Sequence, residues 1–217
     1  RMDYMLEGNR MALVEMNSLS VGQVATAGVV ADCHRGHDSS VLENNPLAGQ
    51  IDLLRKAVGV YETAFGVKGT GVLLLVDDTE SLNPDQFRVI AGIRAAGLAL
   101  TVANLANVDL ALSDNEVLSC SGLEISVVLM RVGYLWDHFA TQAAIDHFKA
   151  IYQSRAVQVG PPLAWALNTK RLQQLLYSDR SILEAHLPLD EAALLRECFQ
   201  EQYPVSTEKL AQVVAQN

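Results

Sequence analysis

Gly69-Thr70-Gly71-Val72-Leu73-Leu74-Leu75-Val76-Asp77-Asp78 is the stretch of sequence that decides the fold. Residues 72–76 form a short, continuous apolar run, which is typical of a strand buried on both faces of a parallel sheet. Asn83-Pro84-Asp85-Gln86 then gives the signals of a helix start: an N-cap, a proline in the first turn and an acid near the positive helix end. This helix runs to Gly97 and a second strand covers 98–102, so the sequence predicts a βαβ unit.

Further elements are predicted on both sides of this unit. Before it come a hairpin, a long helix that weakens at Gly36 and an amphipathic helix, at 2–6 with 12–16, 23–42 and 47–65. After it come two strands, a helix, a brief strand and a mostly helical tail, at 117–120, 125–130, 140–152, 157–159 and 163–217. We therefore predict an α/β fold with a mainly parallel, three-layer sheet, preceded by a β-hairpin and followed by a helical segment.

Composition excludes several classes of protein. The chain has 217 residues, of which 50% are hydrophobic, so it can bury a core and is not disordered. A formal net charge of -9 argues against nucleic acid as a partner, and the lack of a long uncharged apolar run argues against a membrane span. The three cysteines, Cys33, Cys120 and Cys198, are far apart and in no metal spacing, which predicts a reducing compartment and a cytoplasmic location.

Two polar clusters follow predicted strands, at Asp77 to Gln86 and at Arg131 to Tyr134. Ligands of open α/β sheets bind outside the carboxyl ends of the strands. Arg131 offers a planar fork for a carboxylate and Tyr134 offers a hydroxyl, so this pair suits a small molecule that carries a carboxylate. An ordinary surface salt bridge with a packed tyrosine explains the same residues equally well.

Three other groups of residues have candidate chemistry. Glu15 and Asn17 are two apart on an extended segment and so point to one side, where a carboxylate and an amide oxygen suit Mg²⁺; two solvent-facing polar residues are the alternative. The Cys33-His34-Arg35-Gly36-His37 cluster has no matching second pair of ligands, so we expect it to flank a helix end rather than bind zinc. The acidic run from Asp77 to Glu80 is expected to be a solvated loop rather than a cation site.

In these motifs the chain resembles the eukaryotic-type glutathione synthetases, which are ATP-grasp ligases. Arg1-Met2-Asp3-Tyr4-Met5 resembles the family's Arg-Ser-Asp-Tyr-Met, and Glu15-Met16-Asn17-Ser18-Leu19-Ser20 is similar to Glu-Ile-Asn-Thr-Ile-Ser. Arg131-Val132-Gly133-Tyr134 resembles Arg-Asp-Gly-Tyr, and 168–174 resembles Gly-Thr-Lys-Lys-Val-Gln-Gln. Asn44-Asn45-Pro46 and Asp85-Gln86 also fall in register. The matches keep their order and span nearly the whole chain.

The resemblance implies a reaction and a role for each matched residue. The enzymes join γ-glutamylcysteine to glycine with ATP and Mg²⁺. The implied substrate-binding residues are Arg1, Ser20, Asn83, Gln86, Arg131 and Tyr134. The resemblance also implies that Glu15 and Asn17 hold the metal, and that Glu15 and Lys170 lie at the ATP. It implies no catalytic residue, and it implies a homodimer with small-molecule partners.

The chain departs from the family pattern at several positions. Gly22 stands where the family's second serine would be, Val132 replaces an aspartate, and the asparagine before Asp85-Gln86 is shifted to Asn83. Two alternatives therefore stay open: a non-catalytic small-molecule-binding module derived from this family, or a related carboxylate-amine ligase with another amine acceptor. A family segment resembling Lys-Pro-Gln-Arg-Glu-Gly-Gly-Gly-Asn-Asn is not in the 217 residues.

These features predict how the chain is divided into domains. Residues 1–46 would belong to the ATP-grasp region, 47–165 would form the α/β substrate-binding domain, and 166–217 would be a helical segment leading to the rest of the ATP-grasp part. We accordingly expect this chain to be the central part of a ligase. We also expect that residues 1–217 alone do not catalyse the ligase reaction.

Overall fold

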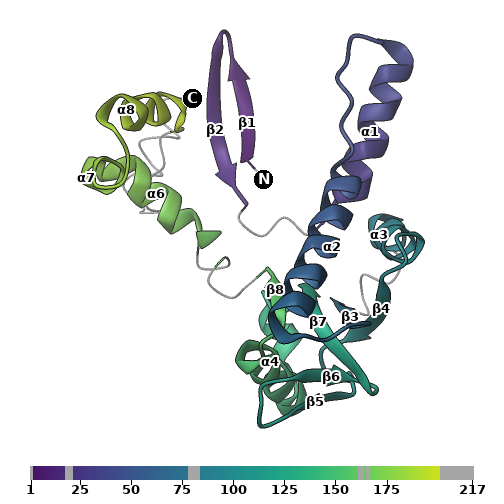
Figure 1. Cartoon of the computed structure of the whole chain (residues 1–217). Coiled ribbons are helices and arrows are strands. Elements are labelled where there is room, and N and C mark those ends of the chain that lie inside the picture. The colour runs from purple at the N-terminus through teal and green to yellow at the C-terminus, as the bar shows by residue number, and fades with distance from the viewer. Residues whose placement is uncertain (1, 18–21, 78–83, 161–163, 165–166, 201–217) are drawn as a thin grey trace. The chain divides into compact units, whose positions relative to one another are not determined.

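A computed structural model describes residues 2–17, 22–77, 84–160, 164 and 167–200 (Figure 1). Contacts divide the chain into two compact units, one of residues 20–161 and one that joins 1–19 to 162–217. Each unit is described by itself below. The assignment of these units to the functional domains expected from the sequence stays a prediction.

The unit of residues 20–161 is built on one mixed sheet. Its elements are α1 (Val24–His37), α2 (Pro46–Phe65), β3 (Gly71–Val76), α3 (Pro84–Ala95), β4 (Ala99–Asn104), β5 (Leu110–Leu112), β6 (Leu118–Cys120), β7 (Leu123–Met130), a 3₁₀ turn η2 (Trp136–Phe139), α4 (Gln142–Gln153) and β8 (Val157–Val159). The order is β4-β3-β7-β6-β5, and β8 also pairs with β7. The pairs β3–β4, β3–β7 and β7–β8 are parallel, whereas β5–β6 and β6–β7 are antiparallel.

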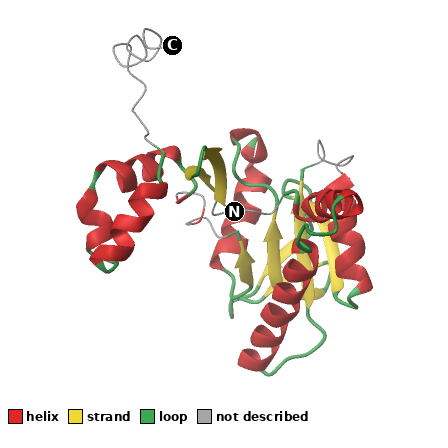
Figure 2. Cartoon of the chain, turned by 90° about the horizontal axis from the view of Figure 1, so that it is seen from above, coloured by secondary structure: helices red, strands yellow, loops and turns green. Residues whose placement is uncertain are grey.

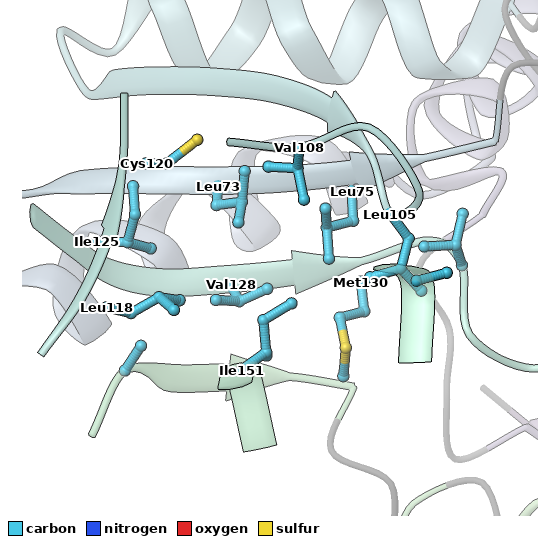
Figure 3. Close-up of a cluster of buried hydrophobic side chains, with 13 residues drawn as sticks. Leu73, Leu75, Leu105, Val108, Leu118, Cys120, Ile125, Val128, Met130 and Ile151 are labelled. Atoms are coloured by element: carbon cyan, nitrogen blue, oxygen red, sulfur yellow. The ribbon is translucent and has the colours of Figure 1, made fainter. Parts of the chain in front are cut away.

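Helices cover both faces of this sheet, which gives the predicted three layers (Figure 2). On one face, Leu54 and Val58 of α2 and Ile93 of α3 pack against Leu74 and Leu129. On the other face, Figure 3 shows Ile151 of α4 in one cluster with side chains of β3 and β7, among them Leu73, Leu75, Val128 and Met130. All of β3 is buried, which confirms the interpretation of its continuous apolar run.

The first two helices of this unit begin in different ways. Asn45 caps α2 by accepting from the Ala48 amide at 3.1 Å, and Gly66 ends this helix with a φ of 68° that favours glycine. Helix α1 is different, because its N-cap Gln23 has a φ of 61° and makes no side-chain cap. Its His34, Arg35 and His37 lie in the last turn, so the Cys-His cluster flanks a helix end as expected.

The other unit contains the hairpin and the C-terminal helices. Its elements are β1 (Met2–Glu7), β2 (Arg10–Met16), α6 (Lys170–Ser178), α7 (Arg180–Glu184) and α8 (Leu189–Cys198). The hairpin is antiparallel and turns at Gly8, whose φ is 62°. Its core is small and consists of Leu13, Leu183, Ala192 and Phe199.

The structure differs from the sequence-based prediction in two details. Strand β5 was not predicted, because three residues are too few to show a period. It pairs with β6 and extends the antiparallel edge that the β6–β7 pair begins. Helix α1 also ends at His37, five residues before the predicted end at Leu42. In the part of the chain that is described, no helix is long and apolar enough to cross a membrane, and the three thiols are free.

Candidate functional site

Arg131 lies at the centre of the site in the sheet unit. Its backbone amide donates to the Leu75 carbonyl at 3.0 Å, which continues the pairing of β3 and β7 beyond the end of β7. Its guanidinium donates from Nη1 to Asp85 Oδ2 at 3.0 Å. The side chains of Arg131 and Asp85 are 3% and 1% exposed, so this is a buried ion pair. The alternative of a surface salt bridge is therefore wrong.

Asp85 joins three elements through one carboxylate. While Oδ2 meets Arg131, Oδ1 accepts from the amides of Ala25 and Thr26 at 2.8 and 2.9 Å. It therefore caps α1, the helix that lacks a cap of its own, although Asp85 belongs to α3. Burial raises the pKa of Asp85, but the hydrogen bonds from Thr26, Arg131 and Ala25 outweigh it, so this pKa lies below its ordinary value.

Gln86 and Tyr134 contribute further polar groups to this unit. Gln86 is 3% exposed, and its Oε1 has no hydrogen-bond partner among the described residues. A buried amide oxygen without a donor is unfavourable in the protein alone and is suited to a ligand that brings a donor. Tyr134 is 48% exposed and follows Gly133, whose φ of 94° favours glycine. Asn83 lies outside the described residues.

Val132 points away from this site. It is 2% exposed and packs in the apolar cluster on the α4 face, together with Leu105 and Met130. Because successive residues of an extended segment point to opposite sides, Arg131 and Val132 serve different faces of the sheet. The valine that replaces the family's aspartate thus fills core space and takes nothing from the surroundings of Arg131.

A second polar group lies at the same end of the sheet. His138 Nε2 is 3.3 Å from Asp77 Oδ2, and His138 Nδ1 accepts from the Gly133 amide at 2.7 Å. A cavity of about 420 Å³ opens here, and Asp77, Asn104 and His138 contribute to its lining. The first residue of the acidic run from Asp77 to Glu80 is therefore tied to the loop after β7, while Asp78 to Glu80 lie outside the described residues.

Candidate nucleotide and metal residues gather in the unit of the hairpin. Lys170 opens α6, and its Nζ lies 3.6 Å from Glu15 Oε2. Thr169 caps this helix by accepting from the Leu172 amide. Gln173 is buried and donates to the Met16 carbonyl at 3.0 Å, which fixes α6 against the end of β2. The predicted residues Glu15 and Lys170 therefore meet in space across 155 positions of sequence.

Asp3 completes this group. It is the cross-strand partner of Glu15 in the hairpin, so both carboxylates lie on one face. Asp3 Oδ2 accepts from Asn17 Nδ2 at 3.1 Å. The Asn17 amide thus uses its nitrogen for Asp3, and its oxygen is the acceptor of the group. The predicted residues Arg1 and Ser20 lie outside the described residues.

These donors fit a Mg²⁺ ion that is held mainly by a nucleotide. No group of three or more His, Cys, Asp or Glu residues with metal-site geometry occurs in the described part of the chain. Mg²⁺ in nucleotide sites uses one or two carboxylates together with phosphates and waters. Glu15 and the Asn17 oxygen supply this kind of partial ligand set.

Sequence reasoning assigned no role to three residues of these groups. Asp3 is part of the Arg1–Met5 motif, the sequence predicts Asp85 to be an acid that serves its own helix, and no motif includes His138. Only Asp85 had a usable signal, since it precedes Gln86 and is the only acid in the first turn of α3.

Comparisons with known proteins agree on one family. The sequence model of the family described as "Eukaryotic glutathione synthase, ATP binding domain" matches residues 1–217. The chain is similar to the chloroplastic glutathione synthetase of Arabidopsis thaliana, at 28% identity over 92% of this chain and 39% of that protein. It is also similar to the glutathione synthetase large chain of Schizosaccharomyces pombe, at 32% identity over 38% of this chain and 16% of that one.

A solved structure has the same fold. It is a glutathione synthetase-like effector from Globodera pallida in its apoform, with a TM-score of 0.70 and 19% identity, and the match covers 92% of this chain and 49% of that one. The chain thus spans less than half of the length of each of these relatives.

Proposed function

Because the chain belongs to the eukaryotic glutathione synthase family, we propose that it supplies the dipeptide site and part of the nucleotide site of a ligase. The ligase would join γ-glutamylcysteine to glycine with ATP and Mg²⁺. The γ-phosphoryl group of ATP passes to the cysteinyl carboxylate of the dipeptide, which gives an acyl phosphate and ADP. The amine of glycine then attacks the acyl carbon, so that a peptide bond forms and phosphate leaves.

The sheet unit would bind the dipeptide. The guanidinium of Arg131, oriented by Asp85, would meet a carboxylate of the γ-glutamyl end, and Tyr134 would add its hydroxyl. Gln86 Oε1 would accept from the ammonium group of the same end. Asn83, Arg1 and Ser20 are proposed to complete these contacts on the strength of the resemblance alone.

The hairpin unit would bind nucleotide and metal. Lys170 would move from Glu15 to the phosphates of ATP, and Glu15 and Asn17 would hold Mg²⁺. The metal would supply positive charge to the phosphate oxygens during phosphoryl transfer. No side chain of this chain is assigned as a general base, so its residues contribute positioning and electrostatics.

One observation carries this proposal: a buried arginine–carboxylate pair at the ends of the two central parallel strands, followed directly in sequence by a buried glutamine oxygen without a partner among the described residues. A buried ion pair costs desolvation and is weak evidence for stability. An acceptor without a donor adds its own desolvation penalty. Binding of a charged ligand explains why a chain would keep both in one place.

Calorimetric titration of the protein with γ-glutamylcysteine tests the proposal. Arg131→Lys keeps a cation for Asp85 but loses the planar fork, so we expect the affinity to fall about tenfold or more. Arg88→Lys, on the exposed side of α3, is the matched control and should bind as the parent does. Gln86→Met should weaken binding while it leaves the free energy of unfolding unchanged or raises it. Saturable binding that is indifferent to Arg131 and Gln86 contradicts the assignment.

A second candidate is a binding module that kept the dipeptide site and does not use ATP. Gly22 favours it, since glycine has no hydroxyl where the family has its second serine. Titration with ATP and Mg²⁺ separates the two candidates, because only a ligase needs nucleotide affinity that depends on Lys170. Another amine acceptor in place of glycine is distinguished by the product formed. A homodimer and a cytoplasmic location stay predictions.

The chain spans 39% of the length of the chloroplastic relative. We therefore propose that residues 1–217 alone bind the dipeptide without turning it over. A ligase assay on the purified chain that detects glutathione would overturn this.

A further inference from the structure

Three successive backbone amides converge on one nitrogen of His138. The amides of Gly133, Tyr134 and Leu135 donate to His138 Nδ1 at 2.7, 3.3 and 3.4 Å. The histidine lies in the 3₁₀ turn η2, directly after the loop whose amides donate hydrogen bonds to it. Its side chain is 5% exposed, and the shortest of the three bonds, from Gly133, is partly shielded from water.

The other ring nitrogen is bound to a different strand end. His138 Nε2 lies 3.3 Å from Asp77 Oδ2, and Asp77 directly follows β3. Because Nδ1 accepts, the ring proton of the neutral imidazole belongs on Nε2, from which it is donated to Asp77. The ring of Tyr134 stands edge-on to the imidazole, with 4.9 Å between the ring centroids. Loop, ring and carboxylate thus form one chain of contacts from the end of β3 to the loop after β7.

We propose that His138 is the positioning residue of the dipeptide site. It would hold the loop of residues 131–135 in the conformation that presents Arg131 and Tyr134 to the ligand. The identity of the ligand rests on the proposed function, whereas the geometry of the loop does not. His138 would not touch the dipeptide or the reacting atoms, and it would act through the backbone of the loop.

The conformation of the loop explains why such an anchor is needed. Gly133 has a φ of 94°, and the three amides belong to no strand or helix ladder. Without an acceptor at the Nδ1 position, the part-buried Gly133 amide and the two more exposed amides after it lose their shared partner inside the protein. The loop would then relax, and with it the position of Tyr134, which is half-exposed.

Two substitutions of His138 separate positioning from simple packing. His138→Asn puts an amide oxygen close to the place of Nδ1 and gives up the contact with Asp77. His138→Leu keeps apolar volume but accepts nothing. The matched control is His147→Leu in the same unit, where the lost contact is with the Leu105 carbonyl and not with the loop.

Titration of the full chain with γ-glutamylcysteine gives the first readout. We expect His138→Leu to weaken binding about tenfold or more, since the loop that presents Arg131 and Tyr134 loses its acceptor. His138→Asn should recover most of this, and His147→Leu should bind within about threefold of the parent. Equal binding by parent and His138→Leu overturns the proposal.

Nitrogen NMR gives a second readout that needs no ligand. In the parent protein the His138 ring should be in the Nε2-protonated form, and the Gly133 amide signal should shift in His138→Leu and return toward its parent position in His138→Asn. A ring protonated at Nδ1, or a Gly133 signal indifferent to His138→Leu, overturns the positioning role even if the dipeptide binds. Absence of dipeptide binding by the parent instead overturns the proposed function, and this NMR result then decides the role of His138 alone.

Discussion

One ion pair in each unit includes candidate site residues, and these two pairs lie in opposite environments. In the sheet unit, Arg131 and Asp85 are almost fully buried and belong to a network that also includes α1. In the hairpin unit, Lys170 and Glu15 are 58% and 36% exposed. Each pair includes a candidate ligand-binding residue, so the comparison concerns burial and not the presence of charge.

The difference has a physical meaning for function. A buried pair is fixed before the ligand arrives, because moving either charge leaves the other one unpaired in a medium of low dielectric constant. An exposed lysine costs little to turn away from its carboxylate. We infer that the sheet unit offers a preformed site, whereas the hairpin unit offers a cation that can leave Glu15 for a phosphate.

Removing Asp85 should have the largest effect. In Asp85→Ala the Arg131 guanidinium loses its carboxylate inside the protein and α1 loses its cap. We expect the free energy of unfolding, measured by urea denaturation, to fall by about 3–5 kcal/mol. Asp52→Ala removes an exposed pair with Arg55 and is the control, with an expected change below about 1 kcal/mol.

A double substitution sharpens this prediction. Asp85→Leu with Arg131→Met replaces both charges by apolar groups, so it should be more stable than Asp85→Ala. It should not bind γ-glutamylcysteine. If Asp85→Ala were as stable as the parent protein, the buried pair would have no structural role and the comparison would fail.

Lowering the pH should remove the part of the free energy of unfolding that ionised Asp85 contributes. Because the pKa of folded Asp85 lies below its value in the unfolded chain, ionised Asp85 stabilises the protein above the unfolded value of about 3.9. This contribution is lost as the pH falls through the folded pKa. The stability difference between the parent protein and Asp85→Asn should therefore shrink as urea denaturation is repeated from pH 6 to acid pH. A constant difference contradicts the depressed pKa.

A third test concerns a polar cluster that has no assigned ligand. Tyr61, which is 1% exposed, donates to Glu124 at 2.8 Å and accepts from Arg155 at 2.9 Å. Tyr61→Phe removes both bonds and keeps the ring, so we expect it to lower the free energy of unfolding by about 1–2 kcal/mol and to leave dipeptide affinity unchanged. Tyr152→Phe, at 63% exposure, is the control with little effect. A loss of affinity in Tyr61→Phe would mean that stability and binding are not separable in this unit.

The sequence predicts most of the sheet unit because its signals are local. The apolar run of β3, the Asn45 cap of α2 and the proline that opens α3 each act within a few residues. The contact of Arg131 with Asp85 has no local signal, because it spans 46 residues and depends on β3 and β7 being neighbours. Residue type and position after a strand suggested Arg131 as a site residue, but nothing local suggested its pairing with Asp85.

Asp85 and His138 show where local rules end. An acid in the first turn normally serves its own helix, and Asp85 has that position but caps α1 instead. His138 serves a loop that precedes it by only three to five residues, but the loop has no period, and the acceptor role of a histidine cannot be inferred from spacing alone. Glu15 is a candidate from its spacing to Asn17 as well as from the resemblance, and Lys170 from the resemblance alone. The two lie far apart in sequence, and the contact between them is a finding of the structure.

The smallest effect on stability is expected at Lys170, and it tests the exposed half of the comparison. Lys170→Met keeps the apolar stem and removes a charge that is screened by water, so the free energy of unfolding should change by less than about 0.5 kcal/mol. Titration with ATP and Mg²⁺ should nevertheless show a clear loss of affinity, since a cation at the phosphates is missing. Lys149→Met, in an exposed pair with Asp146, is the control and should change neither quantity. A large loss of stability in Lys170→Met would mean that this lysine is a fixed structural charge, as Arg131 is. Unchanged ATP affinity would remove it from the nucleotide site.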